Sequence, residues 1–160
     1  MDARAMKRAL ILGICLAAAA AGWVMVGSIE QPAVSMTRPE IDLVAGEILY
    51  AENCAVCHGA KLEGQPNWQV PDENGVLPAP PHDPTGHTWH HSDKALFAYT
   101  KQGGAAALAA SGVTNFNSGM PGFGDALSDD EIWNILEYIK STWPARVRQV
   151  QAERSALDPL

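Results

Sequence analysis

The chain has 160 residues, which is enough for one ordinary domain and marginal for two. Apolar residues make up 47% of it and charged residues 18%, a balance that excludes both a disordered acidic protein and a protein with several membrane spans. The formal charge is −7, and no basic patch indicates a nucleic-acid partner.

Residues 1–29 have the charge and length of a membrane-spanning segment. Residues 1–8 carry three basic side chains, and residues 9–29 then hold no charged one. At about 1.5 Å per residue, such a helix spans about 31 Å, the thickness of a bilayer's hydrocarbon core. Because basic flanks stay in the cytoplasm, the rest of the chain is expected on the periplasmic or outer face of the cytoplasmic membrane.

A cleaved signal peptide is the alternative for this segment. Residues 10–21 are apolar, and Ala19 and Ala21 are small residues of the kind that a signal peptidase recognises. The apolar run continues past them to full spanning length, which favours a retained anchor. Residues 30–39 contain two prolines and show no periodicity, so they are predicted to be a linker.

A domain over residues 40–144 is predicted to begin with a helix at residues 40–53. Apolar side chains recur there at helical spacing and lead directly to a pair of cysteines. Gly46 lies within this pattern, where glycine costs about 1 kcal/mol relative to alanine. It therefore indicates that another backbone crosses closely at this point.

Residues 54–58 read Cys-Ala-Val-Cys-His, the signal for covalent haem attachment. Two thiols three positions apart on a helical turn can form thioethers to the two vinyl groups on one edge of a porphyrin, which holds the adjacent His58 under the iron. A thioredoxin-like redox pair needs a βαβ context that is not visible here, and a zinc site would need a longer gap than zinc fingers use. The motif thus predicts one haem c, attached through Cys54 and Cys57.

Four of the five histidines fall within a stretch of ten residues, 82–91, which belongs to a segment rich in proline. They are His82, His87, His90 and His91. Clustered imidazoles bind copper or zinc, but no thiolate and no carboxylate apart from Asp83 completes such a site. We therefore expect no second metal, and we assign the cluster to haem propionates or to partner docking.

Two further helices are predicted downstream. One begins at Ser92 and runs to residue 101, where two glycines follow. The other covers residues 128–142, since Ser128 and Glu131 match a capping box and a proline follows the run. Its apolar stripe is expected to form core.

Met120 lies between these helices, flanked by glycines and a proline and without helical or strand periodicity. A thioether sulfur is a soft ligand suited to iron in a pocket of low dielectric constant, and ligation by histidine and methionine raises the reduction potential. Every other methionine lies within residues 1–39. Met120 is therefore predicted to be the distal iron ligand opposite His58.

These motifs together resemble the class I c-type cytochromes. The matching elements are Gly46, Tyr50, residues 54–59, residues 120–123, residues 127–132 and residues 138–139. The resemblance covers residues 40–144 and implies an all-α fold of three to five helices around one covalently attached haem. It implies that Cys54 and Cys57 carry the haem, that His58 and Met120 bind the iron, and that the first and last helices cross at Gly46 and Tyr138.

The resemblance implies two further contacts. A proline carbonyl of the family accepts a hydrogen bond from the proximal histidine, and Pro78, Pro80 and Pro81 are all candidates. Trp89 resembles the family's tryptophan near a haem propionate.

A six-coordinate haem has no open position for a substrate, so the expected function is one-electron transfer rather than catalysis. The sequence predicts a membrane-tethered carrier between a quinol-oxidising complex or dehydrogenase and a terminal oxidase or reductase. The alternatives are a redox or gas sensor in which Met120 is displaced, and a fixed cytochrome subunit of a larger oxidoreductase. Residues 28–160 carry a net charge of −9, which predicts basic patches on partners. Residues 145–160 are expected to be a solvated tail.

Overall fold

The computed structural model describes residues 40–160. The expected anchor or signal segment, and the linker that follows it, lie outside these residues. Within residues 40–160, none of the helices combines the length and the hydropathy needed to cross a bilayer.

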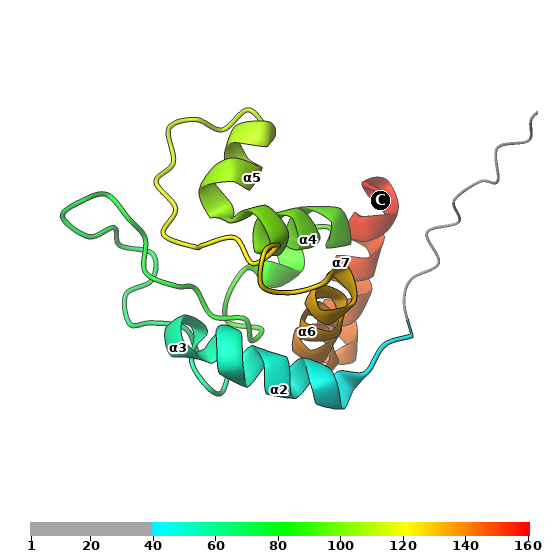
Figure 1. Ribbon diagram of the computed structural model, residues 1–160. Coiled ribbons are helices and arrows are strands. Elements are labelled where there is room, and N and C mark those ends of the chain that lie inside the picture. Colours follow the sequence, from blue (N-terminus) through cyan, green and yellow to red (C-terminus); the bar gives the residue numbers. More distant parts are fainter. Residues whose placement is uncertain (1–39) are drawn as a thin grey trace, which may run out of the picture. The chain divides into compact units, whose positions relative to one another are not determined.

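The described part of the chain is helical, without a named strand (Figure 1). Its elements are α2 (Leu43–Asn53), α3 (Ala55–His58), the 3-10 helix η1 (Thr88–His90), α4 (Asp93–Gln102), α5 (Gly104–Ala110), α6 (Asp129–Ser141) and α7 (Ala145–Leu157). The all-α expectation is confirmed. The six α-helices within residues 40–160 exceed the expected three to five, and α5 and α7 have no counterpart among the predicted helices.

The first helix of the domain crosses α6 at Gly46, as expected. Helix α2 starts after Asp42, whose carboxylate accepts hydrogen bonds from the backbone N–H groups of Val44 and Ala45. A Cβ atom at residue 46 would lie 3.0 Å from the Cβ of Tyr138 and would collide with the carbonyl of Asn134. Only glycine allows the two helices to approach this closely.

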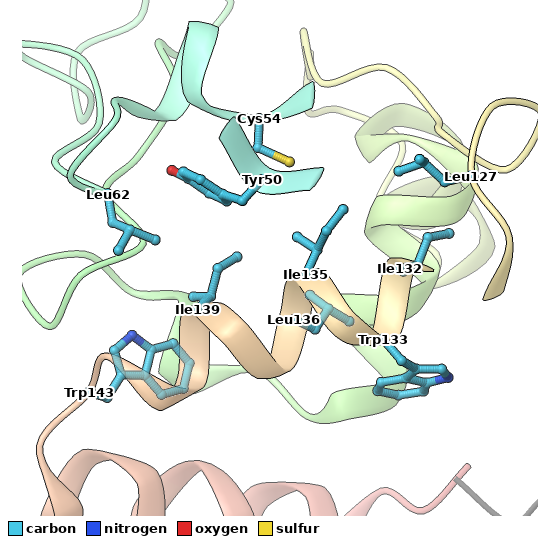
Figure 2. Packing of buried hydrophobic residues seen from close by; sticks show 10 residues of the cluster. All are labelled: Tyr50, Cys54, Leu62, Leu127, Ile132, Trp133, Ile135, Leu136, Ile139 and Trp143. Carbon is cyan, nitrogen blue, oxygen red and sulfur yellow. The ribbon is translucent and has the colours of Figure 1, made fainter. Parts of the chain in front are cut away.

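Helix α6 supplies five of the ten residues of the buried core cluster. Its capping box is present: the Ser128 hydroxyl accepts a hydrogen bond from the backbone N–H of Glu131, and the Glu131 carboxylate accepts one from the backbone N–H of Ser128. Ile135 and Ile139 point toward Tyr50 and Cys54 (Figure 2), whereas Trp133 points to the other side and stacks on Phe97 of α4 with 4.8 Å between ring centroids. The buried residues of the helix are Ile132, Trp133, Ile135, Leu136 and Ile139, and the buried Trp143 follows it.

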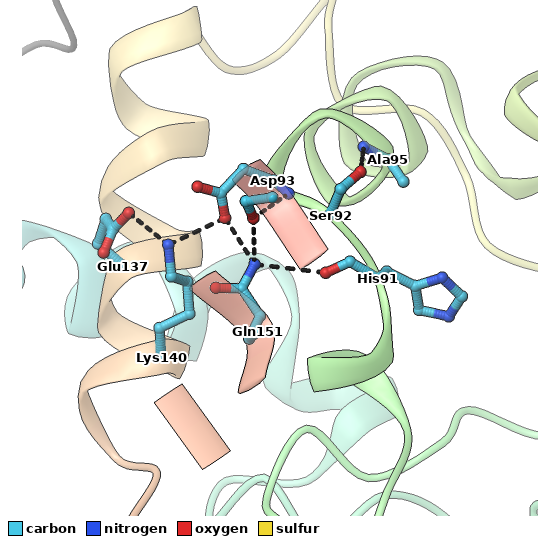
Figure 3. A network of polar contacts seen from close by, with 8 residues as sticks. His91, Ser92, Asp93, Ala95, Glu137, Lys140 and Gln151 are labelled. Carbon is cyan, nitrogen blue, oxygen red and sulfur yellow. Dashed lines mark hydrogen bonds and ion pairs between the residues drawn. The ribbon is translucent and has the colours of Figure 1, made fainter. Parts of the chain in front are cut away.

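The expectation of a solvated tail over residues 145–160 is wrong. These residues form α7 and belong to a compact unit that extends to Leu160. Gln151 of α7 is 1% exposed, and its amide donates to the Asp93 carboxylate at 2.7 Å and to the Ser155 hydroxyl at 3.0 Å (Figure 3). Asp93 also pairs with Lys140 of α6 at 3.0 Å. This network joins α7 to α4 and α6.

Candidate haem site

The two cysteines of the attachment motif lie where α2 passes into α3. Cys54 ends α2 and is the N-cap of α3, so Cys57 follows one short helical turn later. Cys54 is buried, Cys57 is exposed, and neither forms a disulfide. Burial, with a smaller contribution from Cys57, raises the pKa of Cys54 to about 11, so its thiol is protonated at neutral pH. Both sulfur atoms are free to form thioethers.

His58 is buried directly after these cysteines, with one ring nitrogen bonded to the backbone. Its Nδ1 lies 2.8 Å from the carbonyl oxygen of Pro80. Because a carbonyl oxygen can only accept, Nδ1 carries the proton, and Nε2 keeps the lone pair that a metal ligand needs. Burial lowers the pKa of His58, and the hydrogen bond to Pro80 partly opposes that shift. Of the three candidate prolines, Pro80 is the one that makes this contact.

A tight turn after the motif requires glycine. Gly59 ends α3 with a φ angle of 82°, in the left-handed region. Its carbonyl accepts a hydrogen bond of 2.9 Å from the hydroxyl of Tyr50, which is 1% exposed. Burial raises the pKa of Tyr50, so this hydroxyl remains a donor at neutral pH. The Tyr50 ring also packs against Tyr138, with 5.7 Å between centroids, and thereby connects the attachment turn to α6.

The loop that carries Met120 is attached to the end of α4. The Met120 carbonyl accepts from the N–H of Gly104, the first residue of α5, at 3.0 Å. The N–H of Phe123 donates to the carbonyl of Thr100 at 3.0 Å, and that of Gly124 to Lys101 at 2.9 Å. Met120 itself is half-buried. Its backbone is therefore held on both sides by α4 and α5, while its role as iron ligand stays a prediction.

His82 lies against the proximal histidine, a position that the sequence analysis did not predict. Its ring is stacked on that of His58, with 4.0 Å between centroids and 22° between planes. Its Nδ1 lies 2.9 Å from the hydroxyl oxygen of Thr88. Burial, followed by the neighbouring His58, lowers the pKa of His82 well below its usual value. The two prolines before His82 place its backbone beside the site, but periodicity does not reveal this.

The other three clustered histidines pack on aromatic rings. His87 stacks on Trp68 with 5.3 Å between centroids and meets His91 edge-on at 5.4 Å, and its Nδ1 is buried without a hydrogen-bond partner. His90 lies edge-on against Trp89. In the described part of the chain, no three histidine, cysteine or acidic side chains gather as metal ligands.

The indole N–H of Trp89 donates to the carbonyl of Gly86 at 3.1 Å. This bond lies within the turn that precedes α4, so it orients the ring without any cofactor. A contact of Trp89 with a haem propionate stays a prediction.

The donor groups of α3 and of the loop that carries Met120 are those that a haem c needs. Two unpaired thiols stand one helical turn apart, and a neutral imidazole with a free Nε2 follows them. A half-buried thioether lies on a loop held by α4 and α5. Thiols, imidazole and thioether are the groups that attach and ligate haem iron in c-type sites.

Comparison with known proteins agrees with this donor set. The family model described as "Cytochrome c" matches residues 43–143. No curated protein and no solved structure matches the chain.

Proposed function

The chain belongs to the cytochrome c family, whose cofactor is covalently attached haem c, and from that premise we propose a monohaem electron carrier with His58 and Met120 as the iron ligands. The bound haem supplies a reversible one-electron change at its iron. The chain holds the cofactor, orients its ligands and limits access of water.

The observation that best supports this proposal is the bond from His58 to Pro80. A backbone carbonyl on Nδ1 fixes the tautomer that presents Nε2 as a ligand, and it makes the imidazole a stronger donor to a metal. This carbonyl belongs to Pro80, which lies between Ala79 and Pro81. Each proline has a fixed φ angle and restricts the residue before it, so the backbone here has little freedom to move. This arrangement suits an electron carrier, because a ligand that does not move when the iron changes oxidation state keeps the reorganisation energy of electron transfer small.

The anchoring of Met120 favours a carrier over a gas sensor. A sensor requires that the methionine leave the iron easily. Here the loop is bonded to α4 through Phe123 and Gly124, and Met120 is bonded through its own carbonyl. Because these bonds hold the backbone of the loop, the loop cannot swing away from α4 and α5 without breaking them, and displacement of the sulfur is left to rotation of the Met120 side chain.

Carbon monoxide binding to the reduced protein at neutral pH tests the carrier. We expect the purified holoprotein to titrate as a single reversible one-electron couple and to bind no carbon monoxide. The Met120→Ala variant is the matched control and should bind it. Stoichiometric binding by the wild-type protein would favour the sensor.

We further propose that residues 1–29 tether the carrier to the cytoplasmic membrane, with the haem domain on the periplasmic or outer face. The support is the run of residues 9–29 without a charge behind a basic N-terminus. A tether raises the local concentration beside membrane partners, so weak docking suffices. Retention of the full chain in alkali-washed membranes, with an intact N-terminus by mass spectrometry, is the expected result. Release of a chain that lacks these residues would indicate a cleaved signal peptide.

The proposed partners are a quinol-oxidising complex or dehydrogenase as donor and a terminal oxidase or reductase as acceptor. Transient interfaces of this kind are small. A fixed subunit of a larger oxidoreductase would instead copurify with its partner in stoichiometric amounts from mild detergent. We expect the monohaem chain to elute alone.

A further inference from the structure

The imidazole ring of His82 packs against the ring of His58, the proposed iron ligand. The ring of His82 lies 4.0 Å from that of His58 between centroids, and the planes differ by only 22°. Such a spacing leaves no room for water between the rings. The contact is aromatic packing of one histidine on another, which adds to the energy of simple burial.

His82 is held at both its backbone and its ring. Its N–H donates to the carbonyl of Leu62 at 2.8 Å, and its carbonyl accepts from the indole N–H of Trp143 at 2.7 Å. Its Nδ1 bonds to the Thr88 hydroxyl, whose oxygen also lies 3.4 Å from the carbonyl oxygen of Pro81. Either tautomer of His82 can make this bond, because the hydroxyl can both donate and accept.

The two neighbours of His58 restrain different motions of its ring. The carbonyl of Pro80 fixes where Nδ1 points, but a single hydrogen bond leaves the ring free to turn about the direction of that bond. A flat ring stacked on its face opposes this turning. Pro80 and His82 together therefore define both the direction and the plane of the imidazole.

We propose that His82 is a positioning residue that sets the plane in which the His58 imidazole would bind the iron. The inference rests on the proposed function, because it requires His58 to be an iron ligand. The plane of an axial imidazole determines which iron orbital its π electrons overlap. That overlap distributes the unpaired spin of the oxidised haem over the porphyrin edge. Thr88 acts one step further out by holding His82.

The test is the proton NMR spectrum of the oxidised holoprotein, whose haem methyl resonances report the ligand plane. We expect His82→Leu, which keeps an apolar side chain but no ring, to change the order or spread of these resonances. His82→Phe keeps a ring on His58 and should retain more of the wild-type pattern. Thr88→Val removes the hydroxyl that holds His82 and should shift the pattern in the same sense as His82→Leu, by less.

Controls separate this inference from the function on which it rests. Gln149→Ala changes an exposed residue of α7 to which no role at the haem is given, and it should leave the pattern unchanged. A wild-type protein without a low-spin histidine-ligated spectrum would refute the ligand assignment itself. With that spectrum in place, wild-type methyl resonances in His82→Leu would overturn the positioning role. If His82→Leu does not retain haem, unchanged resonances in Thr88→Val would overturn it.

Discussion

Gly46 of α2 faces the backbone of Asn134 in α6, and a Cβ atom at residue 46 would lie 2.7 Å from the Asn134 carbonyl carbon. The side-chain amide oxygen of Asn134 accepts a hydrogen bond of 3.0 Å from the backbone N–H of Asp42, the N-cap of α2. The start of α2 and its crossing point therefore both depend on one residue of α6. Since α2 leads directly to Cys54, this crossing determines the position of the attachment motif relative to α6.

Replacing Gly46 with alanine should destabilise the holoprotein by about 2 to 3 kcal/mol, because the added methyl group meets backbone that has no room to yield. Urea denaturation followed by circular dichroism measures the loss. Glu52→Ala, on an exposed position of the same helix, should change the free energy of unfolding by less than about 0.5 kcal/mol. Equal values for the two variants would contradict the close crossing.

Gln151→Ala should cost about 2 kcal/mol, since it removes a buried donor to Asp93 and leaves the Ser155 hydroxyl and the His91 carbonyl without that partner. Asp93 keeps its ion pair with Lys140, which limits the loss. The matched control is Gln149→Ala on the exposed face of α7. If both variants have the urea midpoint of the wild-type protein, the hydrogen bonds of Gln151 do not hold α7 against α4.

Stability should fall as the pH decreases from about 7.5 to about 5.5. Burial lowers the pKa of His87 and of His91 below the ordinary value of 6.5. The unfolded chain therefore binds more protons in this range than the folded one, so the contribution is complete above 6.5 and is lost below it. The urea midpoint, measured across the range, gives the slope.

His87→Phe is the variant that checks this assignment. Phenylalanine keeps a flat ring against Trp68 but cannot take up a proton. Its urea midpoint should depend on pH less steeply than that of the wild-type protein. An identical dependence would show that His87 contributes nothing to it.

Electron transfer to small reagents should report the acidic surface. Residues 40–160 hold 16 acidic and 7 basic side chains, a net charge of −9. Oxidation by a cationic cobalt(III) complex, followed by stopped flow, should slow as the ionic strength rises from about 0.01 M to about 0.5 M, because salt screens the attraction. Oxidation by ferricyanide should accelerate over the same range. Rates that do not respond to salt would contradict the proposed steering.

The elements predicted correctly are those with strong local signals. The capping box at Ser128, the N-cap at Ser92 and the glycine at residue 46 each depend on residues close in sequence, and the structure confirms all three. The attachment motif is likewise local. Its five residues specify a chemistry by themselves.

The features that the sequence did not reveal depend on distant partners. Helix α7 has no apolar stripe, and its most buried residue is the polar Gln151, so a periodicity of apolar residues could not identify it. The hydrogen bond from His58 to Pro80, rather than to Pro78 or Pro81, depends on how an irregular, proline-rich segment folds back over α3. The stacking of His82 on His58 depends on the same segment. Elements of that kind are set by tertiary contacts rather than by local propensity.

Metal content tests the remaining expectation about the histidine cluster. We expect one iron per chain and neither copper nor zinc in stoichiometric amount, since His87, His90 and His91 pack on aromatic rings or on one another. Elemental analysis of the purified holoprotein measures this ratio. A second metal at one atom per chain would require a different role for these side chains.

The near-infrared absorption of the oxidised holoprotein tests the pairing of His58 with Met120 most directly, because a bond from methionine sulfur to ferric iron gives a weak charge-transfer band there. The account predicts that band in the wild-type protein, its loss in Met120→Ala, and a lower reduction potential in that variant. A band that persists unchanged after the substitution, or that is missing from a fully haem-loaded wild-type protein, would contradict it.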